Sequence, residues 1–142
     1  PEGACDYLDA DVRDPAGIIE RASATLDFDR PIGLMMLGIL GNVEDDDEAR
    51  AIRDHLVGAL PGGSFLVLED GTAAVNPEAA AKAERTRAEA GDPYKLRTPE
   101  QIADRLTGWR DAGVGVALAS RGDALGEPPM VTAFCGVGRK PA

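Results

Sequence analysis

Residues 32–40 read IGLMMLGIL, a run of apolar and glycine residues without a charge. A half-exposed strand alternates apolar with polar residues, whereas a parallel strand covered by helices on both faces is apolar throughout. The Asp29-Arg30-Pro31 turn ends the segment before this run. We therefore predict that residues 32–40 form the central strand of a layered sheet.

Strand and helix patterns alternate around this run. Four predicted helices open with an N-cap residue or a first-turn proline, at Asp14-Pro15, Asp45, Asn76-Pro77 and Thr98-Pro99. The other predicted strands are residues 5–9, 64–68, 113–119 and 131–136. Short connections between alternating elements predict an α/β fold, with a Rossmann-like, doubly wound, mostly parallel sheet between two helix layers and the late strands as an antiparallel hairpin.

Composition limits the function classes. The chain has 142 residues, 44% of them hydrophobic, which suffices for one domain with a core. Its net charge of -10 argues against nucleic acid, because an acidic surface repels phosphates. No apolar run reaches the length of a membrane span and no secretory signal is visible, so we expect a cytoplasmic protein without a membrane partner. Cys5 and Cys135 are expected to be reduced, and one histidine with two cysteines cannot form a zinc site.

In a doubly wound sheet, ligands bind outside the carboxyl ends of the strands. Asp11 follows the first predicted strand, where its carboxylate could accept a hydrogen bond from the exocyclic amine of an adenine. A solvated turn residue explains Asp11 equally well, and Asp14 is expected to cap the helix. Gly38, Gly41 and Asn42 follow the second strand, where small residues let a ligand approach the backbone, although they are equally natural in a loop.

Acidic residues follow the second and third strands. Residues 44–48 (EDDDE) could hold a hard cation, but an acidic first helical turn explains them better. Glu69 and Asp70 are candidates for substrate contact or for a general base. His55, the only histidine, is expected to be exposed or half-buried. Patterns of serine hydrolases and P-loop nucleotidases are missing, and residues 136–138 (GVG) are predicted as a terminal turn.

Six blocks of the sequence occur in a fixed order: DADVRDP (9–15), LDFDRPIGLMMLGIL (26–40), DDDEARAI (45–52), LPGGSFLVLED (60–70), RTPEQIADRLTGW (97–109) and GVGRKP (136–141). Together they resemble the carboxyl-terminal half of an actinobacterial family of class I S-adenosylmethionine-dependent methyltransferases. The resemblance implies a single, partial methyltransferase domain over residues 1–142, with S-adenosylmethionine as cofactor. It also implies a seven-stranded sheet of order 3-2-1-4-5-7-6 with strand 7 antiparallel, in which residues 5–9, 32–40 and 64–68 are strands 3, 4 and 5 and the late pair are strands 6 and 7.

The same resemblance implies roles for the strand-end residues. Asp11 with Val12 would hold the adenine. The loop of residues 38–43 would border the methionine end of the donor and the acceptor, through Gly38, Leu40, Gly41 and Asn42. Family members often carry a His-Phe or Asn-Phe pair where this chain has Gly41-Asn42, so no side-chain role is carried over to Gly41. For a hydroxyl or amine acceptor we predict Asp70 first and Glu44 second as the base, with no metal.

The resemblance further implies that this chain carries part of the donor site. The glycine-rich loop and the acidic residue for the ribose would lie before Pro1, so the chain alone is expected to bind S-adenosylmethionine weakly or not at all. Without its neighbours the strand of residues 32–40 would expose an apolar edge, open to a homo-oligomer or a partner. The predicted function is methyl transfer to a small-molecule acceptor. The alternative is a non-catalytic α/β module, or a degenerate paralogue, that completes its sheet with a partner.

Overall fold

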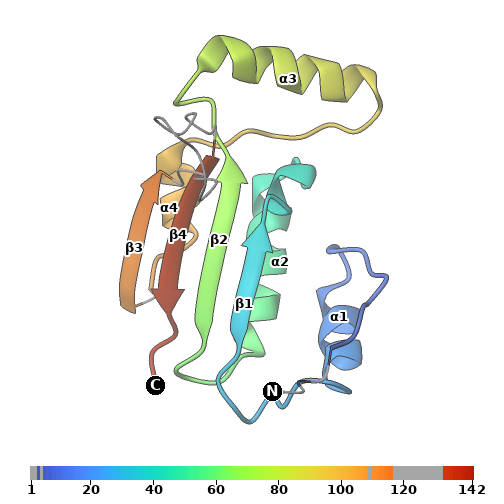
Figure 1. Cartoon of the computed structure of the whole chain (residues 1–142), viewed down its shortest axis with the longest axis vertical. Helices are drawn as coiled ribbons and strands as arrows, with labels where there is room; N and C mark the ends of the chain where they lie inside the picture. Colours follow the sequence, from blue (N-terminus) through green and yellow to red (C-terminus); the bar gives the residue numbers. More distant parts are fainter. Residues whose placement is uncertain (1–2, 4, 109, 117–132) are drawn as a thin grey trace.

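The chain folds around one mixed sheet (Figure 1). The structure, a computed structural model, describes residues 3, 5–108, 110–116 and 133–142. The described strands are β1 (Gly33–Leu37), β2 (Phe65–Gly71), β3 (Arg110–Val116) and β4 (Ala133–Arg139), in the spatial order β1-β2-β4-β3. β1 and β2 are parallel, and β4 is antiparallel to both β2 and β3. The prediction of strands 4-5-7-6 with strand 7 antiparallel is therefore confirmed.

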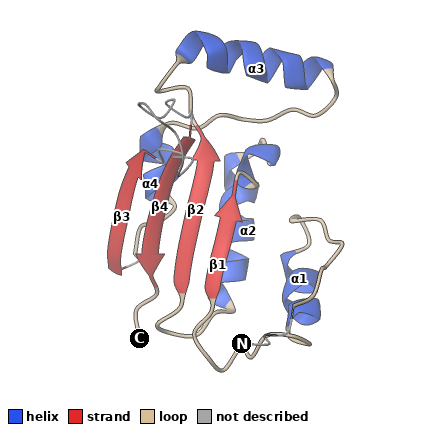
Figure 2. Cartoon of the chain, in the orientation of Figure 1, coloured by secondary structure: helices blue, strands red, loops and turns tan. Residues whose placement is uncertain are grey.

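The helices begin at the predicted cap residues. They are α1 (Pro15–Ala22), α2 (Asp46–Gly58), α3 (Pro77–Glu89) and α4 (Pro99–Asp104), with a short 3-10 helix at Leu40–Asn42. The side chains of Asp14, Asp45 and Asn76 each accept a hydrogen bond from the first turn of their helix, and Thr98 and Gln101 form the expected capping box. α2 and α4 lie behind the sheet, while α3 crosses above the carboxyl ends of β1 and β2 (Figure 2).

One face of the sheet carries the core. Met36, Leu66 and Leu68 point to this face and are at most 3% exposed. They form one cluster with apolar side chains of α2 and of the α4 region, among them Ile52, Leu56, Ile102 and Leu106. Because this cluster is the main buried apolar surface of the described residues, it supplies most of their hydrophobic stabilisation.

Residues 136–138 (GVG) do not form the predicted terminal turn. They lie within β4, where Gly136 pairs with Leu68 and Gly138 with Leu66 of β2. Both glycines are buried and share the core face with those leucines. The prediction was wrong because antiparallel pairing with β2 outweighs the low strand propensity of glycine.

The other face of the sheet is open in the described part of the chain. Met35 and Leu37 of β1 are 62% and 54% exposed, and Phe65 of β2 and Val137 of β4 are 47% and 41% exposed. The two-sided apolar pattern of residues 32–40 predicted helices on both faces, but the described helices that pack on the sheet, α2 and α4, share one face. The pattern thus indicates a second apolar face that these residues leave uncovered.

The position of the β1 strand differs from the prediction. β1 ends at Leu37, and it lies at an edge of the described sheet, not in its centre. Residues 5–9, predicted as a strand, are irregular in the structure. The edge position of β1 and the irregular course of residues 5–9 have one cause: a strand needs a neighbour to hydrogen-bond, and no described strand pairs with the outer edge of β1 or with residues 5–9.

Two smaller expectations concern His55 and the two cysteines. His55 is exposed on α2, as predicted, and Cys5 and Cys135 are free thiols. No helix within the described ranges is both long enough and apolar enough to cross a membrane.

Two adjacent methionines test this assignment of the sheet faces. Met36→Ala should lower the free energy of unfolding by about 2–5 kcal/mol, because it leaves a cavity in the core. Met35→Ala should change it by less than about 0.5 kcal/mol, because that side chain is exposed. Urea unfolding followed by circular dichroism measures both. Equal losses for the two variants would contradict the assignment.

Candidate functional site

Two loop segments meet at the carboxyl ends of β1 and β2. We call residues 38–44 the tip loop and residues 91–97, which connect α3 to α4, the strap. The tip loop leaves β1 at Gly38, whose φ of 63° favours glycine and whose N–H donates to the Glu69 carbonyl at 2.9 Å. The loop then closes the 3-10 turn Leu40–Asn42 and enters α2.

The strap donates hydrogen bonds to most carbonyls of the tip loop. The Arg97 guanidinium donates to the carbonyls of Leu40 and Val43, both at 2.7 Å. Lys95 donates its backbone N–H to the Gly41 carbonyl at 2.8 Å and its ammonium to the Glu44 carbonyl at 2.9 Å. The Asn42 carbonyl accepts from Arg13, at 2.8 Å, on the other side of the loop. Every carbonyl from residue 40 to residue 44 is thus held by a distant part of the chain.

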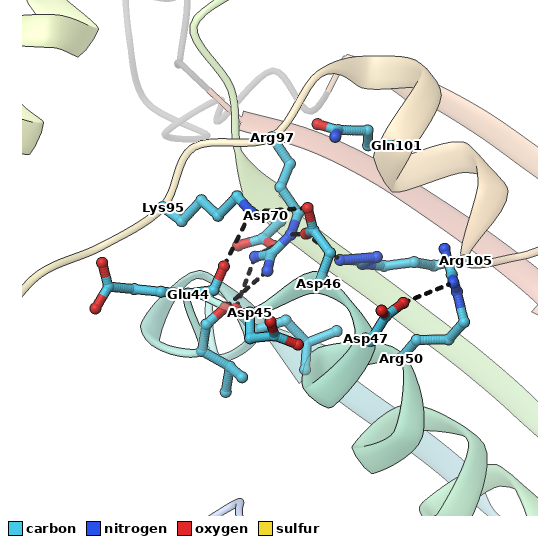
Figure 3. Close-up of polar contacts among 12 residues, drawn as sticks. Glu44, Asp45, Asp46, Asp47, Arg50, Asp70, Lys95, Arg97, Gln101 and Arg105 are labelled. Carbon is cyan, nitrogen blue, oxygen red and sulfur yellow. Dashed lines mark hydrogen bonds and ion pairs between the residues drawn. The ribbon is translucent and has the colours of Figure 1, made fainter.

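Two carboxylates compensate the buried charge of Arg97 (Figure 3). The Arg97 side chain is fully buried, and its Nε donates to Asp46 at 2.9 Å while Nη1 lies 3.4 Å from Asp70, which is also fully buried. Asp46 further accepts from Lys95 at 2.7 Å and from Arg105 at 3.3 Å. A buried guanidinium is tolerated only when it is paired in this way, so the cluster ties α2, β2 and the strap together.

The cluster changes the pKa of its acids and bases. The hydrogen bond from Lys95, together with the bond from Arg97, lowers the pKa of Asp46 to about 2 against the opposing effect of burial. Burial and the nearby charge of Arg97 lower the pKa of Arg105. Asp46 therefore stays ionised at any pH at which the chain is expected to work.

Tyr94 seals the strand tips from above. Its hydroxyl donates to Asp70 at 2.6 Å and accepts from the Gly71 N–H at 3.2 Å, and burial followed by the bond to Asp70 raises its pKa. The ring lies over Gly41, where an added Cβ atom would clash with it. The Arg87 guanidinium covers the ring at 4.6 Å. Gly41 is thus required by the position of Tyr94.

The structure brings two of the predicted strand-end segments together. Arg13 bridges them, since its backbone N–H donates to the Asp11 carboxylate at 2.9 Å while its guanidinium reaches Asn42. Val12 and Ile39 line the same hollow of about 440 Å³, which extends along the outer edge of β1. Asp11 itself is exposed and is not among the residues that line this hollow.

The remaining predicted residues differ in accessibility. Leu40 is 1% exposed and belongs to the core, so only its backbone faces the loop. Asp70 is sealed by Tyr94 and Arg97. Glu44 is exposed, and its side chain points away from the charged cluster (Figure 3). Glu69 is half-buried at the tip of β2, where burial and the charge of Asp70 raise its pKa. The base roles of Asp70 and Glu44 remain predictions.

Sequence reasoning missed the strap. Tyr94, Lys95 and Arg97 follow no predicted strand, and Asp46 was explained by the helix dipole alone. The acidic run does form the first turn of α2, and among the described residues no group of acidic, histidine or cysteine side chains is arranged to hold a metal ion. A useful signal would have been the three cations at 95, 97 and 105, whose charge complements that acidic run.

Comparisons with known proteins identify the family. Residues 1–141 match the S-adenosyl methyltransferase family. The chain belongs to this family. S-adenosylmethionine is accordingly the cofactor of the family, as the resemblance implied. No curated protein matches the chain.

Solved structures agree with this assignment. A DUF574 family protein of Streptomyces avermitilis shares 29% identity at a TM-score of 0.83, covering 95% of this chain and 55% of its own. A proposed methyltransferase of Thermobifida fusca shares 28% identity at a TM-score of 0.77, covering 94% and 53%. An O-methyltransferase family protein of Burkholderia thailandensis, at 19% identity and a TM-score of 0.57 over 96% and 36%, shares the fold. The Rossmann-like fold is confirmed, and the chain spans about half the length of the first two structures.

The pKa of Asp46 predicts an acid-sensitive fold. Its value of about 2 lies below the ordinary 3.8, so the unfolded chain binds the proton more tightly. The stabilisation is complete above about pH 4 and is lost as the pH falls towards about 2. Asp46→Asn should lower the free energy of unfolding at neutral pH and reduce its further decrease at acid pH. Asp47→Asn should change neither quantity, because that side chain is 93% exposed. Urea unfolding between pH 2 and pH 7 measures the free energy of unfolding of both variants. If Asp46→Asn loses as much stability at acid pH as the wild type, the assignment is contradicted.

Proposed function

We propose that this chain forms part of an S-adenosylmethionine-dependent methyltransferase that acts on a small-molecule acceptor. The observation that carries the proposal is the contact between Arg13 and Asn42, which joins the two segments expected to hold the donor. Both segments lie at the end of the sheet where ligands of doubly wound folds bind. In this arrangement Val12 and the tip loop would contact the nucleoside and the methionine end.

The residues present fit part of the donor. Val12 and Ile39 offer an apolar surface for a purine ring beside the exposed carboxylate of Asp11. The donor, when bound, supplies a methyl group on a sulfonium that is already a strong electrophile. This chain's residues would then need only to bind the donor, orient the acceptor and accept its proton.

We propose Glu69 as the proton acceptor for hydroxyl or amine substrates. Both oxygens of Asp70 are engaged, by Tyr94 and by Arg97, so that carboxylate is sealed from a substrate. Glu69 lies next to it at the strand tip, beside Gly38. Its raised pKa is the direction that favours proton uptake from an acceptor. Glu44 is the alternative, since it is exposed at the other end of the tip loop.

Titration with S-adenosylhomocysteine tests the donor site on this chain. We expect weak binding that shifts the amide NMR resonances of Val12, Gly38, Gly41 and Asn42, because these residues carry part of the site. Asp11→Asn should weaken the binding, whereas Asp9→Asn, at another exposed carboxylate of the same segment, should not. Shifts confined to other parts of the chain would refute the proposal.

We also propose a partner for the open side of the sheet. The apolar face formed by Met35, Leu37, Phe65 and Val137, and the outer edge of β1, are left uncovered by the described residues. Leu8, Ala10 and Val12 line the hollow beside this edge at every second position, which is the spacing of a strand. The solved relatives are almost twice as long as the part they share with this chain. The occupant we propose is a segment equivalent to that additional part.

Complex formation tests this occupant. The part of the Streptomyces avermitilis protein outside the match should form a one-to-one complex with this chain in sedimentation velocity. Leu37→Asp should prevent it, because it places a charge on the apolar face, while Ala51→Asp on the exposed side of α2 should not. If this chain instead forms a homodimer and Leu37→Asp dissociates it, the apolar face binds a second copy of the chain. That result would contradict the proposal. No complex would contradict the proposed occupant.

A further inference from the structure

The tip loop is held in place by the strap, which is not among the residues predicted to contact the donor. Five consecutive carbonyls, from residue 40 to residue 44, accept hydrogen bonds from outside the loop, and four of these come from the strap. A loop that borders a ligand must keep its shape to bind it tightly, because ordering the loop on binding costs free energy. The strap supplies this order before any ligand is present.

Arg97 is the central residue of the strap. Its planar guanidinium bridges the carbonyls of Leu40 and Val43, which fixes the curvature of the 3-10 turn between them. The same group reaches Asp46 and Asp70, so it connects the loop to α2 and to β2. A lysine ammonium lacks this rigid fork and cannot reproduce the set of contacts.

A second layer supports the same turn from above. The Tyr94 ring packs on Gly41, and its hydroxyl is fixed by Asp70, which itself faces Arg97. Arg87, at the end of α3, contacts both this ring and the Asn42 side chain. Tip loop, strap and α3 are therefore one connected unit above the strand ends.

We infer that Arg97 is a positioning residue for the methyl donor: it touches no donor atom but holds the tip loop in the shape that binds the methionine end. This inference rests on the proposed function. If it is correct, Arg97 and Lys95 of the strap raise the affinity for the donor by holding the tip loop. The shape of the loop then depends on the guanidinium group of Arg97 and not on its charge alone.

The test compares Arg97→Lys with Arg105→Lys. Both substitutions keep a charge in a buried position beside Asp46, but Arg105 has no hydrogen bond to a tip loop carbonyl. Amide hydrogen exchange measures the loop without any ligand, and the S-adenosylhomocysteine titration measures donor affinity. Arg97→Lys should speed exchange at Asn42 and Val43 and weaken donor binding about tenfold, as expected for losing a charge-assisted hydrogen bond. Arg105→Lys should lower the stability of the fold without speeding tip loop exchange or weakening donor binding.

Lys95→Gln provides a second variant should Arg97→Lys not fold. Lys95 is partly exposed and donates to Glu44, so its loss should leave the chain folded and raise tip loop exchange to a smaller degree. Unaltered exchange in every strap variant that folds would overturn the inference. Faster exchange with unaltered donor affinity would overturn it as well. Donor binding away from the tip loop would refute the proposed function itself, and the titration of the wild-type chain shows this without any variant.

Discussion

A buried guanidinium is the constraint on which the strand-end region depends. Arg97 cannot be left unpaired in the interior, because an uncompensated buried charge costs several kcal/mol. Its partners come from three places in the chain, the tip loop, the first turn of α2 and the end of β2. The position of each of these elements therefore depends on the others, although they are far apart in the sequence.

The same constraint explains why the acidic residues of this chain are not interchangeable. Asp45 caps α2, Asp46 forms ion pairs with three cations, and Asp47 is almost fully exposed, although the three are neighbours. Asp70 and Glu69 differ in the same way, one sealed in the interior and the other half-buried at the strand tip. Local geometry, and not the residue type, separates structural carboxylates from those free to meet a substrate.

Much of the fold follows from local patterns, and the site follows less completely. Caps such as Thr98 and the apolar run in β1 act through neighbouring residues, so the helices were predictable from local patterns, whereas the order of the described strands was expected from the family resemblance. The edge position of β1 did not follow from its apolar pattern, because that pattern fits a covered strand and an exposed one; the exposed edge was expected only from the resemblance. Tyr94 and Arg97 lie about 50 residues after the tip loop, and no local sequence pattern predicts a contact over that separation.

A crystal structure of this chain in complex with S-adenosylhomocysteine would test the central claim most directly. We predict ligand density along the tip loop, with the homocysteine end near residues 38–42, the purine beside Val12, and Arg97 still bridging Leu40 and Val43. Ligand bound away from the strand ends, or a tip loop that abandons those two contacts when the ligand binds, would contradict the account.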